Sequence, residues 1–191
     1  MKIAILTGSI REKRQSHKAA YYVTKALRER GIETDLIDLA ETPLPMYGVE
    51  EAADVQLKEN VANISSRLDD ADALIFVTPE YHGSISGVLK NALDHFWSEF
   101  RKKPIGVIAA SGGKMAGINA STQLQHVILS MGAYPIPLKL LIPEIHNAID
   151  DSFEPQNGQV VRSTEKFLNE FLWFAGALYQ QHAKYKALGV A

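Results

Sequence analysis

The residues best suited to bind an anion lie in one loop near the start of the chain. This loop spans residues 7–18 and offers hydroxyl groups from Ser9 and Ser16. It also offers positive charge from Arg11, Arg14 and Lys18. An apolar run precedes the loop and a helical pattern follows it, so the free N–H groups and the positive dipole end of that helix point back at the loop. The pattern predicts that the loop holds a phosphate.

Three familiar phosphate motifs do not fit this loop. A P-loop needs a second glycine five positions after the first, where this chain has Lys13. A dinucleotide fingerprint needs three glycines, and here there is only Gly8. A cysteine phosphatase needs a thiolate, and the chain has no cysteine. The phosphate is therefore expected to be held and not transferred. The alternative is a solvated basic turn in which Ser16 merely caps the helix.

A second loop, residues 78–84, could support a flat ligand. Pro79 fixes the turn and Gly83 permits close approach of the backbone, with Glu80, Tyr81 and His82 between them. A planar ring could stack there and accept backbone N–H hydrogen bonds. We expect no metal site, because no second histidine stands at a ligand spacing from His82. A hydrolase is also disfavoured, because the G-x-S-x-G elbow is absent.

A third loop, residues 111–117, begins Ser111-Gly112-Gly113 and has a further glycine at position 117. Glycines let the backbone approach a ligand without side-chain bulk, although a flexible surface turn is the alternative.

The elements that must position these loops alternate as strand and helix along the chain. Strand-like segments are expected at 3–7, 33–39, 73–77, 104–110 and 134–140. Each is followed by a helical pattern, which predicts a flavodoxin-like three-layer α/β/α sandwich. Its five-stranded parallel sheet would have the order 2-1-3-4-5, and the three loops would meet at one carboxyl edge.

Several finer expectations follow from the same patterns. Pro135 and Pro137 place the fifth strand at an edge of the sheet. The helix after residue 86 is expected to bury a stripe that includes Phe96 and Trp97. Residues 141–159 are expected to be irregular, polar and either mobile or at an interface. A last helix is expected over 160–183.

The composition is that of an ordinary globular protein, with 191 residues, 46% hydrophobic and 22% charged, and a formal charge of −2. We expect one domain, residues 1–191. No basic excess suggests nucleic acid. The apolar run after Met1 is too short for a signal sequence or a membrane span, so we expect a cytoplasmic protein with no membrane partner.

Three segments together resemble a known family. They are Gly8-Ser9-Ile10-Arg11 with Ser16, the continuous stretch from Pro79 to Asp94, and Ser111-Gly112-Gly113. They are similar to the NAD(P)H-dependent FMN reductases of the flavodoxin-like superfamily. The similarity covers roughly residues 1–140.

The resemblance implies which residues hold FMN. Its phosphate would lie on Ser9, Arg11, Ser16 and Lys18, the last of which is Asn in many members. Its isoalloxazine would lie along Pro79, Glu80, Tyr81, His82 and Gly83, mostly through backbone atoms, and position 82 is often Asn. Ser111, Gly112 and Gly113 would close over the other rim. Members are usually homodimers or homotetramers, with the 89–97 helix near an interface, so Phe96 and Trp97 could face either a partner subunit or the core.

The function implied is hydride transfer from NADPH or NADH to FMN N5, followed by electron transfer to a second acceptor. The sequence leaves open whether that acceptor is a flavin, a quinone, an azo compound or a metal oxyanion. We name no catalytic side chain, because the cofactor carries this chemistry. The alternatives are a flavodoxin-like electron carrier without its own NAD(P)H oxidation, and a binding module that has lost the flavin. Carriers are typically strongly acidic for docking, unlike this chain.

Overall fold

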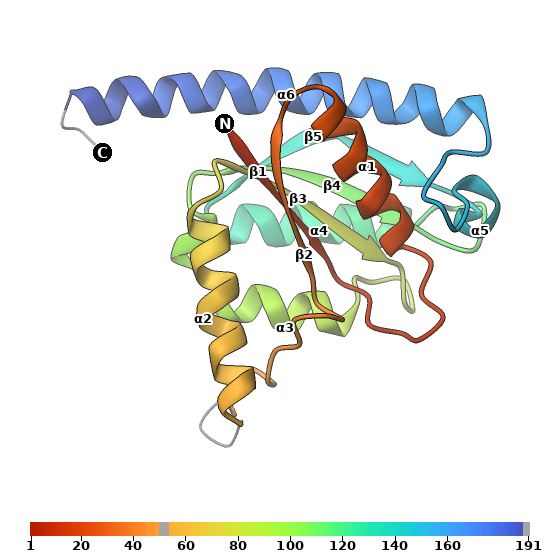
Figure 1. Cartoon of the computed structure of the whole chain (residues 1–191), viewed down its shortest axis with the longest axis horizontal. Helices are drawn as coiled ribbons and strands as arrows, with labels where there is room; N and C mark the ends of the chain where they lie inside the picture. The colour runs from red at the N-terminus through yellow and green to blue at the C-terminus, as the bar shows by residue number, and fades with distance from the viewer. Residues whose placement is uncertain (50–53, 189–191) are drawn as a thin grey trace.

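The protein is a twisted five-stranded parallel sheet with helices on both faces, as a computed structural model shows (Figure 1). The structure describes residues 1–49 and 54–188. The strand order is β2-β1-β3-β4-β5, which confirms the predicted flavodoxin-like topology. The strands are β1 (Lys2–Thr7), β2 (Glu33–Asp38), β3 (Ala73–Pro79), β4 (Pro104–Ala110) and β5 (Tyr134–Ile142). The helices are α1 (His17–Glu29), α2 (Val55–Asp69), α3 (Gly87–His95), α4 (Ile118–Ser130), α5 (Ile145–Ala148) and α6 (Gly158–Ala187).

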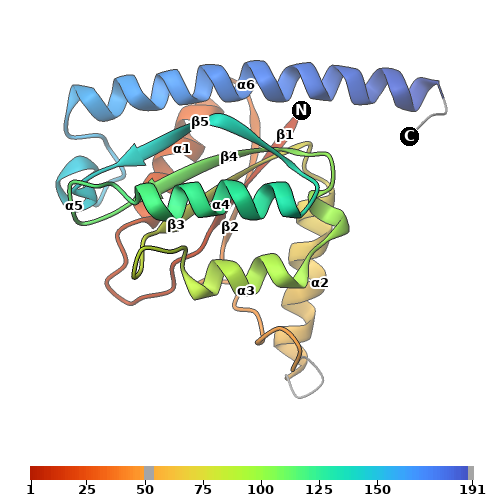
Figure 2. The same cartoon turned by 180° about the vertical axis from the view of Figure 1, so that it is seen from behind.

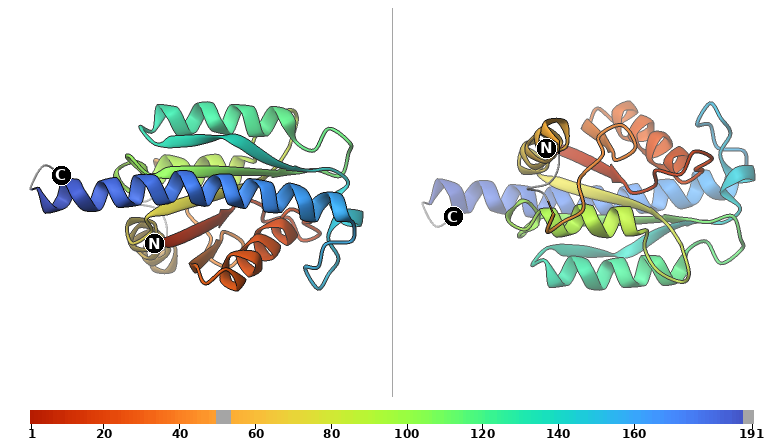
Figure 3. Two further views of the ribbon diagram at one scale, coloured as in Figure 1. Left: turned by 90° about the horizontal axis from the view of Figure 1, so that it is seen from above. Right: turned by 90° about the horizontal axis from the view of Figure 1, so that it is seen from below.

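Two cores hold the layers together. Residues of α1 and α6 pack on one face of the sheet, and residues of α2, α3 and α4 pack on the other. Figure 3 shows α6 lying across the sheet with α1 beside it. Every residue of β3 and of β4 is buried, because both faces of these central strands are covered by helices. This is why both strands read as continuous apolar or small-residue runs in the sequence.

The edge position predicted for the fifth strand is confirmed. β5 pairs with β4, and it advances from Pro135 to Lys139 while β4 advances only from Ile105 to Val107. The extra residues form a bulge around the two prolines, which cannot donate to a ladder.

Two expectations about packing are wrong. Phe96 is buried but Trp97 is 68% exposed, so the expected stripe stops one residue early. The cause is that α3 ends at His95, and the extended backbone of Phe96 turns Trp97 outward. Residues 141–159 are also more regular in secondary structure and more apolar than expected. They include the end of β5 and α5, with Ile142, Ile145 and Ile149 buried.

The last helix is longer than the sequence pattern indicates. Its carboxyl-terminal part runs past the end of the sheet (Figure 2). Within the described residues, no helix combines the length and apolar character needed to cross a membrane.

Candidate functional site

The three loops begin side by side at the carboxyl edge of the sheet. Thr7 is in register with Val77 of β3 and with Asp38 of β2, and Pro79 is in register with Ala110. Gly8 donates its N–H to the Val77 carbonyl at 3.0 Å, and its own carbonyl accepts from the Ser86 hydroxyl. A Cβ at Gly8 would collide with Leu89, so the close approach of the first loop to α3 requires glycine here.

The first loop presents buried hydroxyl groups. Ser9 and Ser16 are almost fully buried, as is Thr7 at the end of β1. Ser16 is the residue before α1, but its side chain makes no capping hydrogen bond. The Ser16 and Thr7 hydroxyl oxygens are buried without a hydrogen-bond partner. Because buried polar groups are normally paired, these two hydroxyls are candidates to hydrogen-bond a bound group.

Arg14 has a role that the sequence did not reveal. It donates to both carboxylate oxygens of Asp38, with Nη2 2.7 Å from Oδ2, and to the Ser9 carbonyl at 2.9 Å. Asp38 is buried. The hydrogen bond to its carboxylate raises the pKa of Arg14 above its ordinary value. Arg14 therefore braces the loop against β2. The position of Asp38 at the end of a strand next to β1 is the only sequence signal that could have suggested this.

The second loop is a tight hairpin turn. Tyr81 and Ser84 exchange backbone hydrogen bonds of 2.9 and 3.0 Å, and both central residues have positive φ, 51° at His82 and 73° at Gly83. This is the geometry of a type I′ turn, which favours Asn-Gly. Since the Tyr81 N–H is used within the turn, the N–H groups of His82 and Gly83 remain as the candidates to meet a ring.

Side chains connect the first and second loops. The Tyr81 hydroxyl lies 3.3 Å from Ser9 Oγ, and the Arg11 guanidinium lies over the Tyr81 ring, 5.6 Å from its centroid. The structure thus brings together three of the predicted site residues.

The Glu80 side chain binds the start of α4. Its Oε2 accepts from the N–H groups of Asn119 at 2.9 Å and Ala120 at 3.0 Å, which places a carboxylate at the positive end of that helix. Because the Glu80 carboxylate is hydrogen-bonded to α4, only its backbone is left to contact a ligand. Gln123 of the same helix also donates to the Gly83 carbonyl at 2.9 Å. α4 therefore anchors the second loop.

The third loop is tied to the segment after β5. The Ser111 hydroxyl donates to the Gly113 carbonyl at 2.9 Å. The N–H groups of Ile145 and Glu144 donate to the carbonyls of Ser111 and Gly113. A Cβ at Gly112 or Gly113 would meet nothing within 4 Å, so this side of the loop is open to a ligand.

Lys18 lies in the first turn of α1, next to the first loop, and is buried. Its ammonium is 2.7 Å from the carboxylate of Asp151. His17 beside it packs edge-on against Tyr21 and Phe153. Burial, followed by the positive charge of Arg14, lowers the pKa of His17. The sequence did not indicate that residues 150–154 lie against α1.

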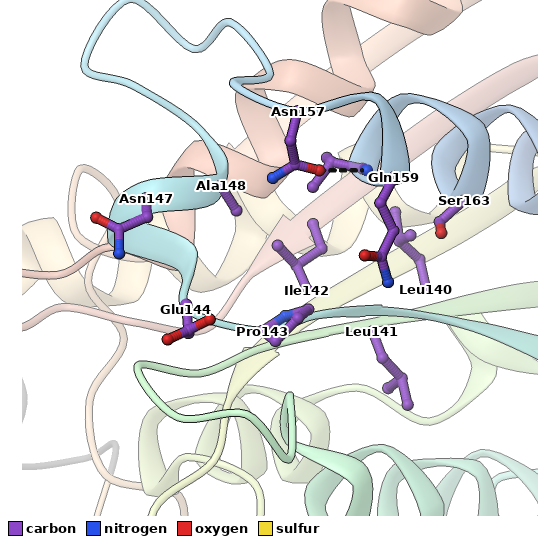
Figure 4. A pocket seen from close by; sticks show the side chains of 11 residues that line it. Leu140, Leu141, Ile142, Pro143, Glu144, Asn147, Ala148, Asn157, Gln159 and Ser163 are labelled. Atoms are coloured by element: carbon purple, nitrogen blue, oxygen red, sulfur yellow. Dashed lines mark hydrogen bonds between the residues drawn. The ribbon is translucent and has the colours of Figure 1, made fainter.

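A separate cavity of about 130 Å³ lies between the end of β5, α5 and the start of α6 (Figure 4). The predicted site residues do not line it. Polar side chains of Glu144, Asn147, Gln159 and Ser163 surround it, together with apolar residues from β5. It adjoins the third loop through backbone hydrogen bonds of two lining residues: the Ile142 carbonyl accepts from the Ser111 N–H, and the Glu144 N–H donates to the Gly113 carbonyl.

A model of the family described as NADPH-dependent FMN reductase matches residues 1–147. The chain belongs to this family. An FMN-dependent NADPH-azoreductase from Staphylococcus aureus is 31% identical over 193 residues, covering 96% of this chain and 100% of that protein. As a member of the NADPH-dependent FMN reductase family, the chain is an NAD(P)H-dependent flavin oxidoreductase that uses FMN.

Solved structures share the fold. The flavoenzyme NAD(P)H:(acceptor) oxidoreductase FerB from Paracoccus denitrificans superimposes with a TM-score of 0.79 at 24% identity, over 92% of this chain and 97% of that one. The NAD(P)H:quinone oxidoreductase from Methanothermobacter marburgensis has a TM-score of 0.63 at 19% identity, over 88% and 96% of the two chains.

Proposed function

We propose that this family member binds FMN across the three loops and uses NADPH or NADH to reduce an aromatic acceptor, most specifically an azo compound. The proposed position of the FMN phosphate rests mainly on one observation. The buried hydroxyls of Thr7 and Ser16 have no partner, at the end of β1 and the start of α1 where a phosphate would be held.

The chemistry of the first loop fits a phosphate monoester. Ser9 and Ser16 supply hydroxyl donors, Arg11 supplies a guanidinium, and Lys18 supplies an ammonium. The brace from Arg14 to Asp38 fixes the Ser9 carbonyl and thus the shape of the loop. A preshaped loop loses less entropy when the ligand binds.

The ring is proposed to lie along Pro79–Gly83, with Ser111, Gly112 and Gly113 at its other rim. The N–H groups of His82 and Gly83 project at the hairpin turn and would donate to polar atoms of the ring. FMN held there would supply the redox chemistry, which is hydride uptake from the nicotinamide and electron transfer to the acceptor. The chain's own part is to hold and orient the two reactants and to leave one face of the ring accessible.

The acceptor is inferred from two observations. The S. aureus relative, similar over its whole length, is an azoreductase. Apolar side chains are also exposed at these loops: Ile10 in the first loop, Met115 in the third, and Ile118 at the start of α4. These favour an aromatic acceptor over a small oxyanion such as chromate.

We also propose that the protein is a cytoplasmic homodimer or homotetramer. Exposed Met46, Tyr47 and Trp97 lie along or beside α3, where Tyr47 packs edge-on against His95. Exposed apolar side chains near one helix favour a subunit interface.

A single-turnover experiment tests the function. FMN-loaded protein is mixed anaerobically with one equivalent of NADPH or NADH, and the flavin absorbance is followed. Bleaching by the nicotinamide alone is expected, followed by reoxidation on adding an azo dye or a quinone. A flavodoxin-like carrier would bleach only with a partner reductase. A panel of azo, quinone, flavin and chromate acceptors then ranks kcat/KM, and a preference for chromate would contradict the aromatic assignment.

A further inference from the structure

A short strap, residues 149–157, lies beside α1 and contacts it from Lys18 to Lys25 (Figure 1). It lies beyond the residues that match the family. Its two ends form a β-bridge between Ile149 and Pro155. The carboxylate of Asp150 accepts from the N–H groups of Ser152 and Glu154, each at 2.9 Å, and from the Gln156 amide at 2.7 Å. The strap is therefore a defined structure and not a loose connection.

Two contacts fasten the strap to α1. Phe153, with a φ of 64°, stacks on Tyr21 with ring centroids 4.5 Å apart. Farther along the helix, Glu154 forms an ion pair with Lys25. The Phe153 stacking fixes where Asp151 lies relative to the first turn of α1, because the solvent-exposed pair of Glu154 and Lys25 contributes little to holding the strap.

Asp151 forms an unequal ion pair with Lys18. The Lys18 side chain is only 6% exposed, whereas that of Asp151 is 97% exposed. Lys18 is the second residue of α1 and follows Ser16 by two positions, so its ammonium belongs to the end of the helix where the phosphate is proposed to bind. In the structure this ammonium is held by a carboxylate of the strap.

We propose that Asp151 weakens FMN retention by competing with the FMN phosphate for Lys18. The inference rests on the phosphate placement proposed above. A dianionic phosphate and a carboxylate cannot share one buried ammonium without repelling each other. Because Asp151 is exposed, it can turn into solvent when FMN binds, and it returns to Lys18 when FMN leaves. Asp151 thus sets how readily the enzyme exchanges its flavin.

The test measures dissociation constants of FMN and riboflavin for the full-length chain freed of bound flavin, by quenching of flavin fluorescence. Asp151→Asn removes the charge and keeps the shape of the side chain. It is expected to tighten FMN about two- to fivefold, the scale of an exposed ion pair, and to leave riboflavin, which has no phosphate, unchanged. Glu154→Gln is the matched control in the same strap, and it should change neither affinity.

Two further variants make the result decisive. In a Lys18→Met background, which should bind FMN more weakly, Asp151→Asn should tighten FMN by a smaller factor. Arg11→Ala tests the placement itself: if FMN affinity does not fall, the proposed phosphate site is wrong. If Arg11→Ala weakens FMN but Asp151→Asn has no effect, weakens FMN, tightens riboflavin equally, or is matched by Glu154→Gln, the competition is refuted while the site stands.

Discussion

Arg14 and Asp38 form a bidentate ion pair that joins the first loop to the end of β2. The same guanidinium also donates to the Ser9 carbonyl, so one buried contact fixes the backbone of the loop proposed to hold the FMN phosphate. A pair that is largely withdrawn from water is strongly destabilising when only one member is removed.

Asp38→Asn should therefore lower both stability and FMN affinity. We expect a loss of about 2–4 kcal/mol in the free energy of unfolding, measured by urea denaturation, because Arg14 is left half-buried without a counter-charge. Asp94→Asn is the control, since Lys90 and Asp94 form an exposed pair one helical turn apart. That change should cost no more than about 0.5 kcal/mol. Equal effects of the two substitutions would show that the Arg14 brace has no special role.

Stability should fall on mild acidification because of His17. Burial and the charge of Arg14 lower the pKa of His17 in the folded protein, whereas the unfolded chain regains a value of about 6.5. As the pH falls below about 6.5, the unfolded chain takes up a proton that the folded chain resists, so the contribution of His17 to stability is lost as the pH falls through the folded pKa. His17→Phe, which retains aromatic packing against Tyr21 and Phe153, should flatten this pH dependence. Urea midpoints at about pH 7.5 and 5.5 measure it, and exposed His126→Gln should leave the wild-type slope intact.

The hairpin turn gives a prediction about sequence tolerance. His82→Asn should keep stability and flavin affinity, because Asn adopts positive φ readily and Asn-Gly suits a type I′ turn. Gly83→Val should weaken flavin binding at least tenfold, since a β-branched residue is strained at a φ of 73°. No protein atom lies within 4 Å of the added Cβ, so the loss would come from the turn and from the ring's space. Fluorescence titration with FMN decides this, and a Gly83→Val protein with wild-type affinity would refute the ring placement.

Glu80 should link helix stability to the flavin site. Glu80→Ala removes the cap of α4 and should cost about 1 kcal/mol, and it should weaken FMN binding because the second loop loses its anchor. Asp54 caps α2, which is part of none of the three loops, by accepting from the Leu57 N–H at 2.8 Å. Asp54→Ala should cost a similar amount of stability with unchanged FMN affinity. If both variants bind FMN alike, Glu80 is only a helix cap.

The fold was predictable because its strands carry simple signals. β1, β3 and β4 are buried on both faces and appear as uninterrupted apolar or small-residue runs, and the prolines of β5 mark an edge. Once that topology is assumed, parallel strands bring the three loops to one edge without further information. The contact of Ser9 with Tyr81 follows from this arrangement.

Other features depend on contacts that no local pattern encodes. Arg14 lies in a polar loop, and its pairing with Asp38 requires the exact path of that loop. The strap has no periodicity, so its stacking of Phe153 on Tyr21 and its pairing of Asp151 with Lys18 could not be read from the sequence. The helical spacing predicts that Trp97 is buried, but α3 ends at His95 and the extended backbone of Phe96 turns Trp97 toward solvent.

The most direct test of the proposed site compares FMN with riboflavin in wild type and Arg11→Ala. We predict that Arg11→Ala weakens FMN by about 1.5–3 kcal/mol, through loss of a charge-assisted phosphate contact, and leaves riboflavin affinity nearly unchanged. Unaltered FMN affinity, or an equal loss for both flavins, would contradict the placement of the phosphate on this loop.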